Sequence, residues 1–284
     1  MTQAIRAILG AARATRAAAG RREATATRGR YTAPMAGRSK GEKVDADGVR
    51  PDAVALSRRL ARAIPEPVCE LDHENPWQLL VATILSAQST DRRVNLVTPA
   101  LFEACPTPEA LAEAPRERVE ELVKSTGFFR NKAKNIQGAS SLLVERHGGQ
   151  VPADLDALVA LPGVARKTAN LVMGFCFGRP TGIVVDTHAG RVARRLGLTR
   201  EEDPVKVERD LCAAFPESLW ILTGQRFVLH GRYVCLARKP RCAHCALNEL
   251  CPSAEAAPAG TWTARARFED RLVASRGDVD EPGR

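Results

Sequence analysis

The 284-residue sequence has no long apolar run. Its apolar stretches, such as Ile183–Val185, are only a few residues long. A membrane-spanning helix needs about 20 apolar residues, so we expect no membrane span. The first residues lack the apolar segment of a secretory signal, which argues against disulfide bonds. The sequence also lacks internal repeats and any alternation of strand and helix patterns, which excludes a parallel α/β sheet.

The formal net charge is +9, but it is unevenly distributed. Residues 1–45 carry +7 and residues 252–284 carry −1, which leaves +3 for the chain between them. A positive balance favours a polyanionic partner, but only local basic clusters can place it on the folded part. We expect residues 1–45 to be a disordered basic tail and residues 252–284 to be mostly disordered, with Trp262 and Phe268 as partial anchors.

Apolar residues at helical spacing dominate the region between the tails. Pro76–Ser89 is apolar almost all round and follows Asn75, a candidate N-cap, so we expect a buried central helix. Gly182–Val185 is the only strand-like stretch and suits an extended buried link. Further helices are expected at 51–64, 92–103, 108–114, 116–124, 131–146, 155–161, 166–177, 188–196, 204–215 and 219–233. The sequence therefore predicts an all-α fold.

Four of the eight cysteines lie close together with the spacing C-x6-C-x2-C-x5-C, namely Cys235, Cys242, Cys245 and Cys251. Four thiolates this near along the chain can bind one metal centre with little loop-closure cost. Zinc and a [4Fe-4S] cluster both accept four thiolates. Zinc ribbons usually pair two C-x2-C knuckles and this sequence has one, so the spacing favours the cluster while zinc and four unligated thiols stay open. The other cysteines are expected to be ordinary reduced residues.

The loop between the first two of these cysteines is basic. It carries Arg238, Lys239 and Arg241, and no acidic residue occurs from Gln225 to Arg241. A loop held at both ends by metal ligands is a suitable surface for phosphate contacts. A solvated basic loop is the alternative.

The stretch Leu161–Ala169 predicts a tight hairpin that enters a helix. Its outward N–H groups and the helix dipole favour a backbone phosphate of nucleic acid. Lys167 lies in the first helical turn beside Arg166, and both the dipole and the guanidinium disfavour an ammonium there. Lys167 is therefore a candidate amine nucleophile for Schiff-base chemistry, with a simple phosphate contact as the alternative.

Asp186 follows the apolar Ile183–Val185 and precedes Thr187 and His188. Asp is a common N-cap, so it could simply begin the next helix. It could also be a carboxylate that stabilises positive charge or assists proton transfer in a cleft. The two interpretations are compatible, because capping would hold the side chain in place.

Together, these features resemble the endonuclease III branch of the helix-hairpin-helix DNA glycosylases. The resemblance covers about residue 50 to Cys251 and rests on Leu85–Asp91, Leu161–Ala169, Val185–His188, His230–Tyr233 and the four cysteines. It implies two helical domains with a DNA-binding cleft between them. A six-helix domain would cover residues 69–179, and an iron–sulfur cluster domain would cover residues 46–68 and 180–251.

The resemblance also implies an activity, namely that of a bifunctional DNA glycosylase and AP lyase of base excision repair that removes oxidised pyrimidines. Lys167 matches the family's nucleophile, which attacks C1′ of the flipped nucleotide, forms an imine and cuts the strand 3′ to the lesion by β-elimination. Asp186 matches the catalytic carboxylate. The four clustered cysteines match the ligands of a [4Fe-4S] cluster.

DNA contacts follow from the same resemblance. Gln88 matches a glutamine that fills the hole in the duplex, and Phe128 stands where the family usually has a leucine wedge, with core packing beside Phe129 as the alternative. Ala165 replaces the family's second hairpin glycine, which would weaken phosphate binding if that position required a positive φ. The full set of expected contacts is Gln88, Phe128, Gly163, Ala165, Arg166, His188, Arg238, Lys239 and Arg241.

Two other functions share part of this pattern. Adenine DNA glycosylase shares the fold and the cluster but lacks a lysine at the position of Lys167 and typically has a further domain after the cluster. A non-enzymatic DNA-binding module would need neither Lys167 nor Asp186. We expect a monomer that acts on double-stranded DNA with oxidised pyrimidines or abasic sites in a bacterial cytoplasm, associated with the nucleoid, with organellar targeting by the N-terminal tail as a minor alternative.

Overall fold

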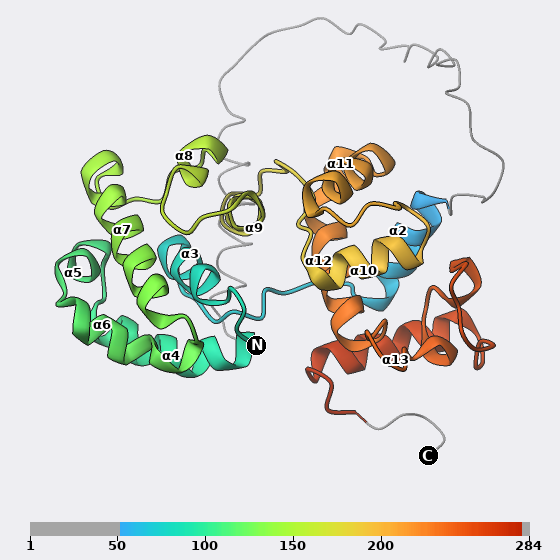
Figure 1. Ribbon diagram of the computed structural model, residues 1–284. Coiled ribbons are helices and arrows are strands. Elements are labelled where there is room, and N and C mark those ends of the chain that lie inside the picture. The colour runs from blue at the N-terminus through green and yellow to red at the C-terminus, as the bar shows by residue number, and fades with distance from the viewer. Residues whose placement is uncertain (1–51, 280–284) are drawn as a thin grey trace, which may run out of the picture. The chain divides into compact units, whose positions relative to one another are not determined.

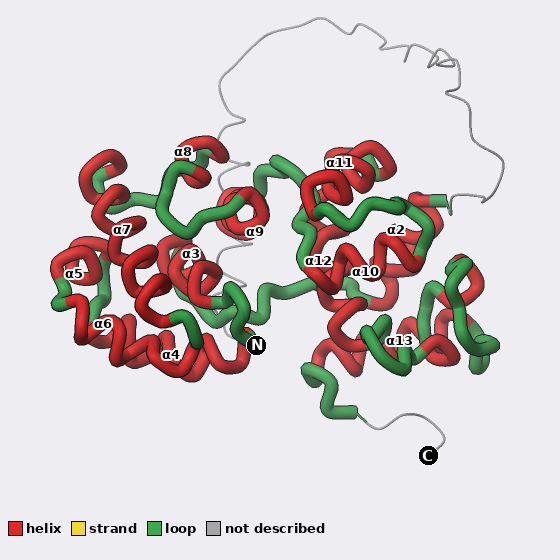
Figure 2. The backbone as a smooth tube through the Cα atoms, in the orientation of Figure 1, coloured by secondary structure: helices red, strands yellow, loops and turns green. Residues whose placement is uncertain are grey.

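The structure is a computed structural model that describes residues 52–279. The basic tail predicted at residues 1–45 lies outside these residues. Within the described range, helices are joined by loops and no strand occurs (Figure 2), which confirms the all-α prediction. No helix in this range is both long and apolar enough to cross a bilayer.

A first group of helices packs around α3 (Pro76–Leu85). The residues of α3 are almost all buried, and Asn75 begins the helix by accepting a 2.9 Å hydrogen bond from Gln78 N–H, as predicted. This group shares one hydrophobic cluster. Its other members are α4 (Asp91–Ala104), α5 (Pro108–Glu113), α6 (Arg116–Val123), α7 (Phe129–His147), α8 (Leu155–Val159) and α9 (Arg166–Phe177). Its helices, from α3 to α9, are labelled in Figure 1.

A second group of helices shares another cluster, which contains Leu56, Val192, Phe227 and Phe268. Its helices are α2 (Ala53–Ala63), α10 (Thr187–Arg195), α11 (Pro204–Ala214), α12 (Trp220–Tyr233) and α13 (Trp262–Ala274). All described residues belong to one compact unit, so the division into two domains stays a prediction.

The prediction of a mostly disordered C-terminal tail is wrong for residues 262–274, which form α13. Phe268 is buried, as its anchoring role required. The helix also buries Arg265 and Glu269, two charged side chains that a sequence pattern assigns to the surface. Their partners lie in other segments of the chain, and this is why the helix escaped prediction.

Residues 182–185 form the buried link that was expected between α9 and α10. Ile183, Val184 and Val185 are all buried, and none of them belongs to a strand. Two glycines let α12 pack closely against this part of the chain. A Cβ on Gly224 would lie 2.8 Å from Val184 N, and one on Gly231 would lie 2.9 Å from His188 O. The link is thereby held against α12, and Asp186 stands at its end.

Candidate active site and cysteine-lined cavity

Lys167 and Asp186 line the same pocket. Lys167 is the second residue of α9, and Asp186 is the N-cap of α10. Both side chains are half-buried, and Leu171 and Val184 add apolar surface to the pocket wall. The structure therefore brings together the two residues that the sequence singled out for chemistry.

The hairpin before α9 requires glycine at one position. Gly163 has φ = +77°, and a Cβ there would lie 2.8 Å from the Cβ of Asn135. Ala165, the N-cap of α9, has φ = −83° and ψ = 164°, a conformation open to any L-residue. Alanine in place of the family's second glycine therefore causes no backbone strain.

The Lys167 amine has no polar partner in the described part of the chain. Within residues 52–279 it takes part in no hydrogen bond and no ion pair. Its neighbour Arg166, by contrast, donates from Nε to Glu208 Oε1 of α11 at 3.2 Å. Whether Arg166 also contacts DNA stays a prediction, whereas its ion pair with Glu208 could not be foreseen from the sequence.

Asp186 caps α10 through a single carboxylate oxygen. Its Oδ1 accepts hydrogen bonds of 2.8 Å from the backbone N–H groups of both His188 and Ala189. Among the described residues, nothing donates to Oδ2. The capping interpretation is thus confirmed, and one oxygen remains available to the pocket.

The same pocket contains a charged network that the sequence analysis did not assign. Arg232 of α12 bonds to Asp91 Oδ2 at 2.7 Å and also to Glu70, which accepts from Tyr233 as well. Burial lowers the pKa of Arg232, but the Asp91 and Glu70 carboxylates outweigh this and hold it above its usual value. Arg232 and Asp91 lie inside two of the motifs quoted above, so a signal existed for them, whereas Glu70 had none.

Cys69 also lines the pocket. Burial raises the pKa of its thiol to about 12. The cysteines of the described residues form no disulfide bond.

Three of the expected DNA contacts share an unusual backbone conformation. Gln88, Phe128 and Lys239 all have positive φ, at 54°, 48° and 51°. Such strain in residues other than glycine tends to occur at functional sites. Phe128 is 68% exposed, which contradicts the alternative that it packs in the core, whereas Phe129 packs against the first hydrophobic cluster.

The remaining expected contacts differ in exposure. Arg238 is exposed, like Gln88 and Lys239. Arg241 is half-buried and donates from Nη1 to Tyr233 O at 2.6 Å. The Nδ1 atom of His188, which is also half-buried, lies 3.3 Å from Arg191 Nη2. The exposure of these side chains does not show whether they contact DNA, so the contacts stay predictions.

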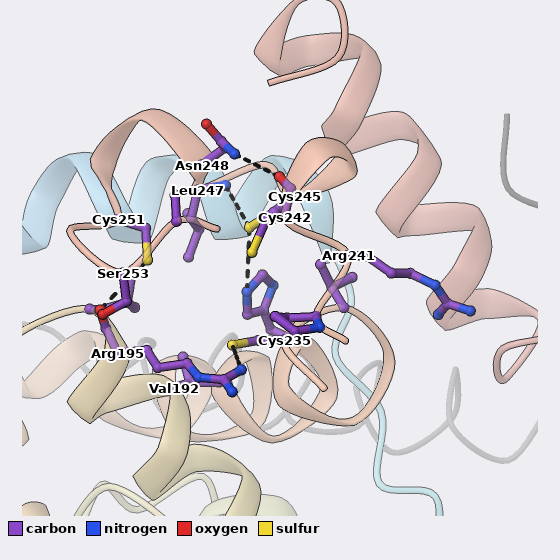
Figure 3. Close-up of a pocket in the computed structure, with 15 residues that line it drawn as sticks. Val192, Arg195, Cys235, Arg241, Cys242, Cys245, Leu247, Asn248, Cys251 and Ser253 are labelled. Atoms are coloured by element: carbon purple, nitrogen blue, oxygen red, sulfur yellow. Dashed lines mark hydrogen bonds between the residues drawn. The ribbon is translucent and has the colours of Figure 1, made fainter. Parts of the chain in front are cut away.

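The four clustered cysteines face a second cavity (Figure 3). Val192, Leu196, Val234 and Leu247 surround them with apolar side chains. Two nitrogen groups donate to the sulfurs: Arg195 Nη1 lies 3.3 Å from Cys235 Sγ, and Leu247 N lies 3.3 Å from Cys245 Sγ. A cavity lined by four cysteine sulfurs, with N–H donors beside two of them, suits a metal centre with sulfur ligands.

The donor arrangement bears on which metal centre fits. Ligands of one tetrahedral zinc ion bring their sulfurs to about 3.8 Å from one another, given a Zn–S bond of about 2.3 Å. Within residues 52–279, no three or more His, Cys, Asp or Glu residues are arranged for a single metal ion. The four cysteines that line the cavity supply one sulfur for each iron of a four-iron cluster.

Comparisons with known proteins agree on one family. Residues 81–217 match the model of the HhH-GPD superfamily of base excision DNA repair proteins. The chain is 54% identical over 197 residues to endonuclease III of Synechocystis sp., an alignment that covers 69% of this chain and 90% of the relative. Endonuclease III of Escherichia coli is 43% identical, with 68% of this chain and 91% of the relative covered. The chain belongs to the endonuclease III family.

Solved structures of endonuclease III share the fold. A non-covalent endonuclease III–DNA complex matches with a TM-score of 0.68 and 43% identity, covering 71% of this chain and 94% of that one. A trapped covalent endonuclease III–DNA intermediate matches equally well in TM-score and identity. As a member of the endonuclease III family, the chain is a DNA glycosylase and AP lyase of base excision repair.

Proposed function

We propose that this member of the endonuclease III family removes oxidised pyrimidines from duplex DNA through a Schiff base on Lys167. The observation that carries the proposal is that Lys167 and Asp186 line one pocket. The free Lys167 amine attacks C1′ of the flipped nucleotide, and the bond from C1′ to the base breaks. The sugar ring opens as the imine forms, and loss of a C2′ proton then breaks the C3′–O bond. Water hydrolyses the imine and restores the lysine.

Asp186 acts beside the amine. Its Oδ1 is held by two backbone N–H groups, so Oδ2 has a fixed position in the pocket. A carboxylate there stabilises the positive charge that develops at C1′ as the base leaves, and it is placed to move a proton. Helix capping and catalysis therefore use different oxygens of one side chain.

The proposed contacts with the duplex are made by side chains that are exposed on the protein surface. Phe128 is exposed and acts as the wedge between bases, while Gln88 fills the space left by the flipped nucleotide. An apolar wedge offsets the few kcal/mol lost when a base unstacks. The hairpin at Gly163 and the exposed Arg238 and Lys239 bind backbone phosphates without reading sequence.

The four cysteines hold a [4Fe-4S] cluster. The four sulfurs line one cavity, and the N–H donors of Arg195 and Leu247 lie beside Cys235 Sγ and Cys245 Sγ, where they can hydrogen-bond to metal-bound sulfur. Bound there, the cluster supplies structural or redox-sensing chemistry rather than hydrolysis. It also fixes both ends of the basic loop that carries Arg238 and Lys239.

The proposed activity is tested with purified protein on duplexes that contain thymine glycol, an 8-oxoguanine mispair, an abasic site or no lesion. Incision at thymine glycol and at the abasic site, with little at 8-oxoguanine and none in intact DNA, is the expected result. Binding to all four duplexes without incision would contradict the proposal and favour a non-enzymatic DNA-binding protein. Incision at the 8-oxoguanine mispair alone would contradict the proposed substrate class.

A further inference from the structure

Helix α13 holds the backbone of one cluster ligand. Arg265, 2% exposed, donates from Nε to Cys245 O at 2.9 Å. Its other nitrogens donate to Gly260 O at 2.6 Å and to Glu249 Oε1 at 2.7 Å. One buried guanidinium thus binds both ends of the short stretch from Cys245 to Glu249.

The same helix also reaches the sulfur of Cys245 through a second side chain. Glu269 Oε1 lies 2.5 Å from His230 Nδ1, and His230 Nε2 lies 3.7 Å from Cys245 Sγ. His230 belongs to α12, so the path runs from α13 through α12 to the cysteine. Two independent contacts from α13 therefore converge on Cys245.

These buried polar groups are costly if they serve packing alone. Glu269 and His230 are 0% and 2% exposed, and within the described residues Glu269 Oε2 has no hydrogen-bond partner. Burial of such groups costs free energy that apolar side chains would not, and an unsatisfied buried oxygen calls for an explanation. Helix α13 also lies beyond Cys251, where the sequence motifs of the family end. The polar contacts of α13 therefore point to a role at the cysteine cavity.

We propose that α13 is a clasp for the iron–sulfur cluster, in which Glu269 orients the His230 ring so that Nε2 donates a hydrogen bond to Cys245 Sγ. The clasp rests on the proposed cluster. Glu269 is a positioning residue that acts through His230, and Arg265 fixes the backbone of the same ligand. Groups that orient metal ligands control how firmly the metal is held, and hydrogen bonds to the sulfurs set the reduction potential of a cluster.

Two substitutions separate orientation from charge at position 269. Glu269→Gln keeps the length of the side chain and can still hydrogen-bond to His230 Nδ1, but it removes the carboxylate. Glu269→Asp keeps the carboxylate but shortens the reach by one methylene. Asp270→Asn is the control, because Asp270 is an exposed neighbour on the same helix.

The measurements are the rate of iron release to a chelator and the reduction potential of the DNA-free protein. Glu269→Asp should lose iron about tenfold faster than wild type, the loss typical of an outer-shell partner, and its potential should be more negative because the bond to sulfur is lost. Glu269→Gln and Asp270→Asn should match wild type in both. If Glu269→Asp does not fold, Glu269→Ala takes its place, and the same faster iron release and more negative potential are expected of it.

The clasp is wrong if Glu269→Gln loses iron or shifts the potential as Glu269→Asp does, or if Glu269→Asp behaves like the control. Failure of the cluster itself gives a different result. Wild-type protein without bound iron and without the visible absorption of an iron–sulfur cluster would contradict the proposed cofactor before any variant is compared.

Discussion

Arg166 donates a hydrogen bond from Nε to Glu208 Oε1 over 3.2 Å, so the residue before Lys167 is tied to helix α11. The same carboxylate oxygen accepts from Asn170 Nδ2, one turn further along α9, at 3.0 Å. Glu208 is only 8% exposed. The start of α9, which carries the proposed nucleophile, is therefore fixed by a carboxylate from a different part of the chain.

Glu208→Ala should lower the free energy of unfolding by about 1–3 kcal/mol, because it leaves the buried Asn170 amide without its acceptor. It should also slow cleavage at abasic sites, since Lys167 loses its fixed position. Urea unfolding and an incision assay measure the two effects. The control is Glu201→Ala, which breaks an exposed ion pair with Lys206 and should change stability by less than about 1 kcal/mol. Equal effects of the two variants would show that Glu208 does not support the hairpin.

The hairpin offers a matched pair of substitutions. Gly163→Ala should destabilise the protein by about 1–3 kcal/mol and weaken DNA binding, because position 163 has a positive φ and a Cβ would meet Asn135. Ala165→Gly should change stability by less than about 1 kcal/mol, since glycine caps a helix better than alanine but has more freedom in the unfolded chain. Thermal unfolding and duplex titration test both. Tighter DNA binding by Ala165→Gly would mean that alanine weakens the phosphate site.

Phe128→Ala should leave stability within about 0.5 kcal/mol of wild type, because the side chain is exposed. It should weaken binding to a duplex with a stable abasic analogue by about tenfold, equivalent to about 1.4 kcal/mol of lost wedge contact. Phe128→Leu should retain most of the affinity. Leu96→Ala, which truncates another exposed apolar side chain at 64% exposure, is the control. Phe128→Ala with wild-type affinity would exclude the wedge.

Cys69 should resist alkylation in the folded protein. Burial raises its pKa from 9.0 to about 12, so at pH 8 its reactive thiolate is about 1,000-fold rarer than in the unfolded chain. Iodoacetamide labelling followed by mass spectrometry compares native protein with protein in urea. The thiol should become reactive as the pH approaches 12 or the chain unfolds. Labelling of native Cys69 at pH 8 at the rate found in urea would show that the thiol is not protected.

The sequence predicted most helices because their apolar residues follow helical spacing. It located α3 and its Asn75 cap from local signals alone. It missed α13 because Arg265 and Glu269 are buried only by virtue of partners in other segments. The spacing of residues along the chain does not indicate which distant residues will pair with a buried charge.

Some residues of the candidate site could likewise be predicted from the sequence, and others could not. Lys167 and Asp186 could be predicted because each lies in a motif with a chemical interpretation. The role of Glu70 could not, since its partners Arg232 and Tyr233 are distant in sequence. Phe128 and Phe129 are adjacent, and the sequence alone does not show that Phe128, which has a left-handed backbone, is the one that faces solvent.

The central claim is that the Lys167 amine bonds to the sugar of the lesion. Borohydride reduction during reaction with abasic-site DNA, followed by peptide mapping, tests it most directly. The adduct should lie on Lys167, and Lys167→Ala should give none. Lys132 is the informative competitor, because burial lowers its pKa, but it is only 5% exposed and its Nζ donates to Thr126 O at 2.7 Å. An adduct on Lys132, or one formed equally by Lys167→Ala, would contradict the account.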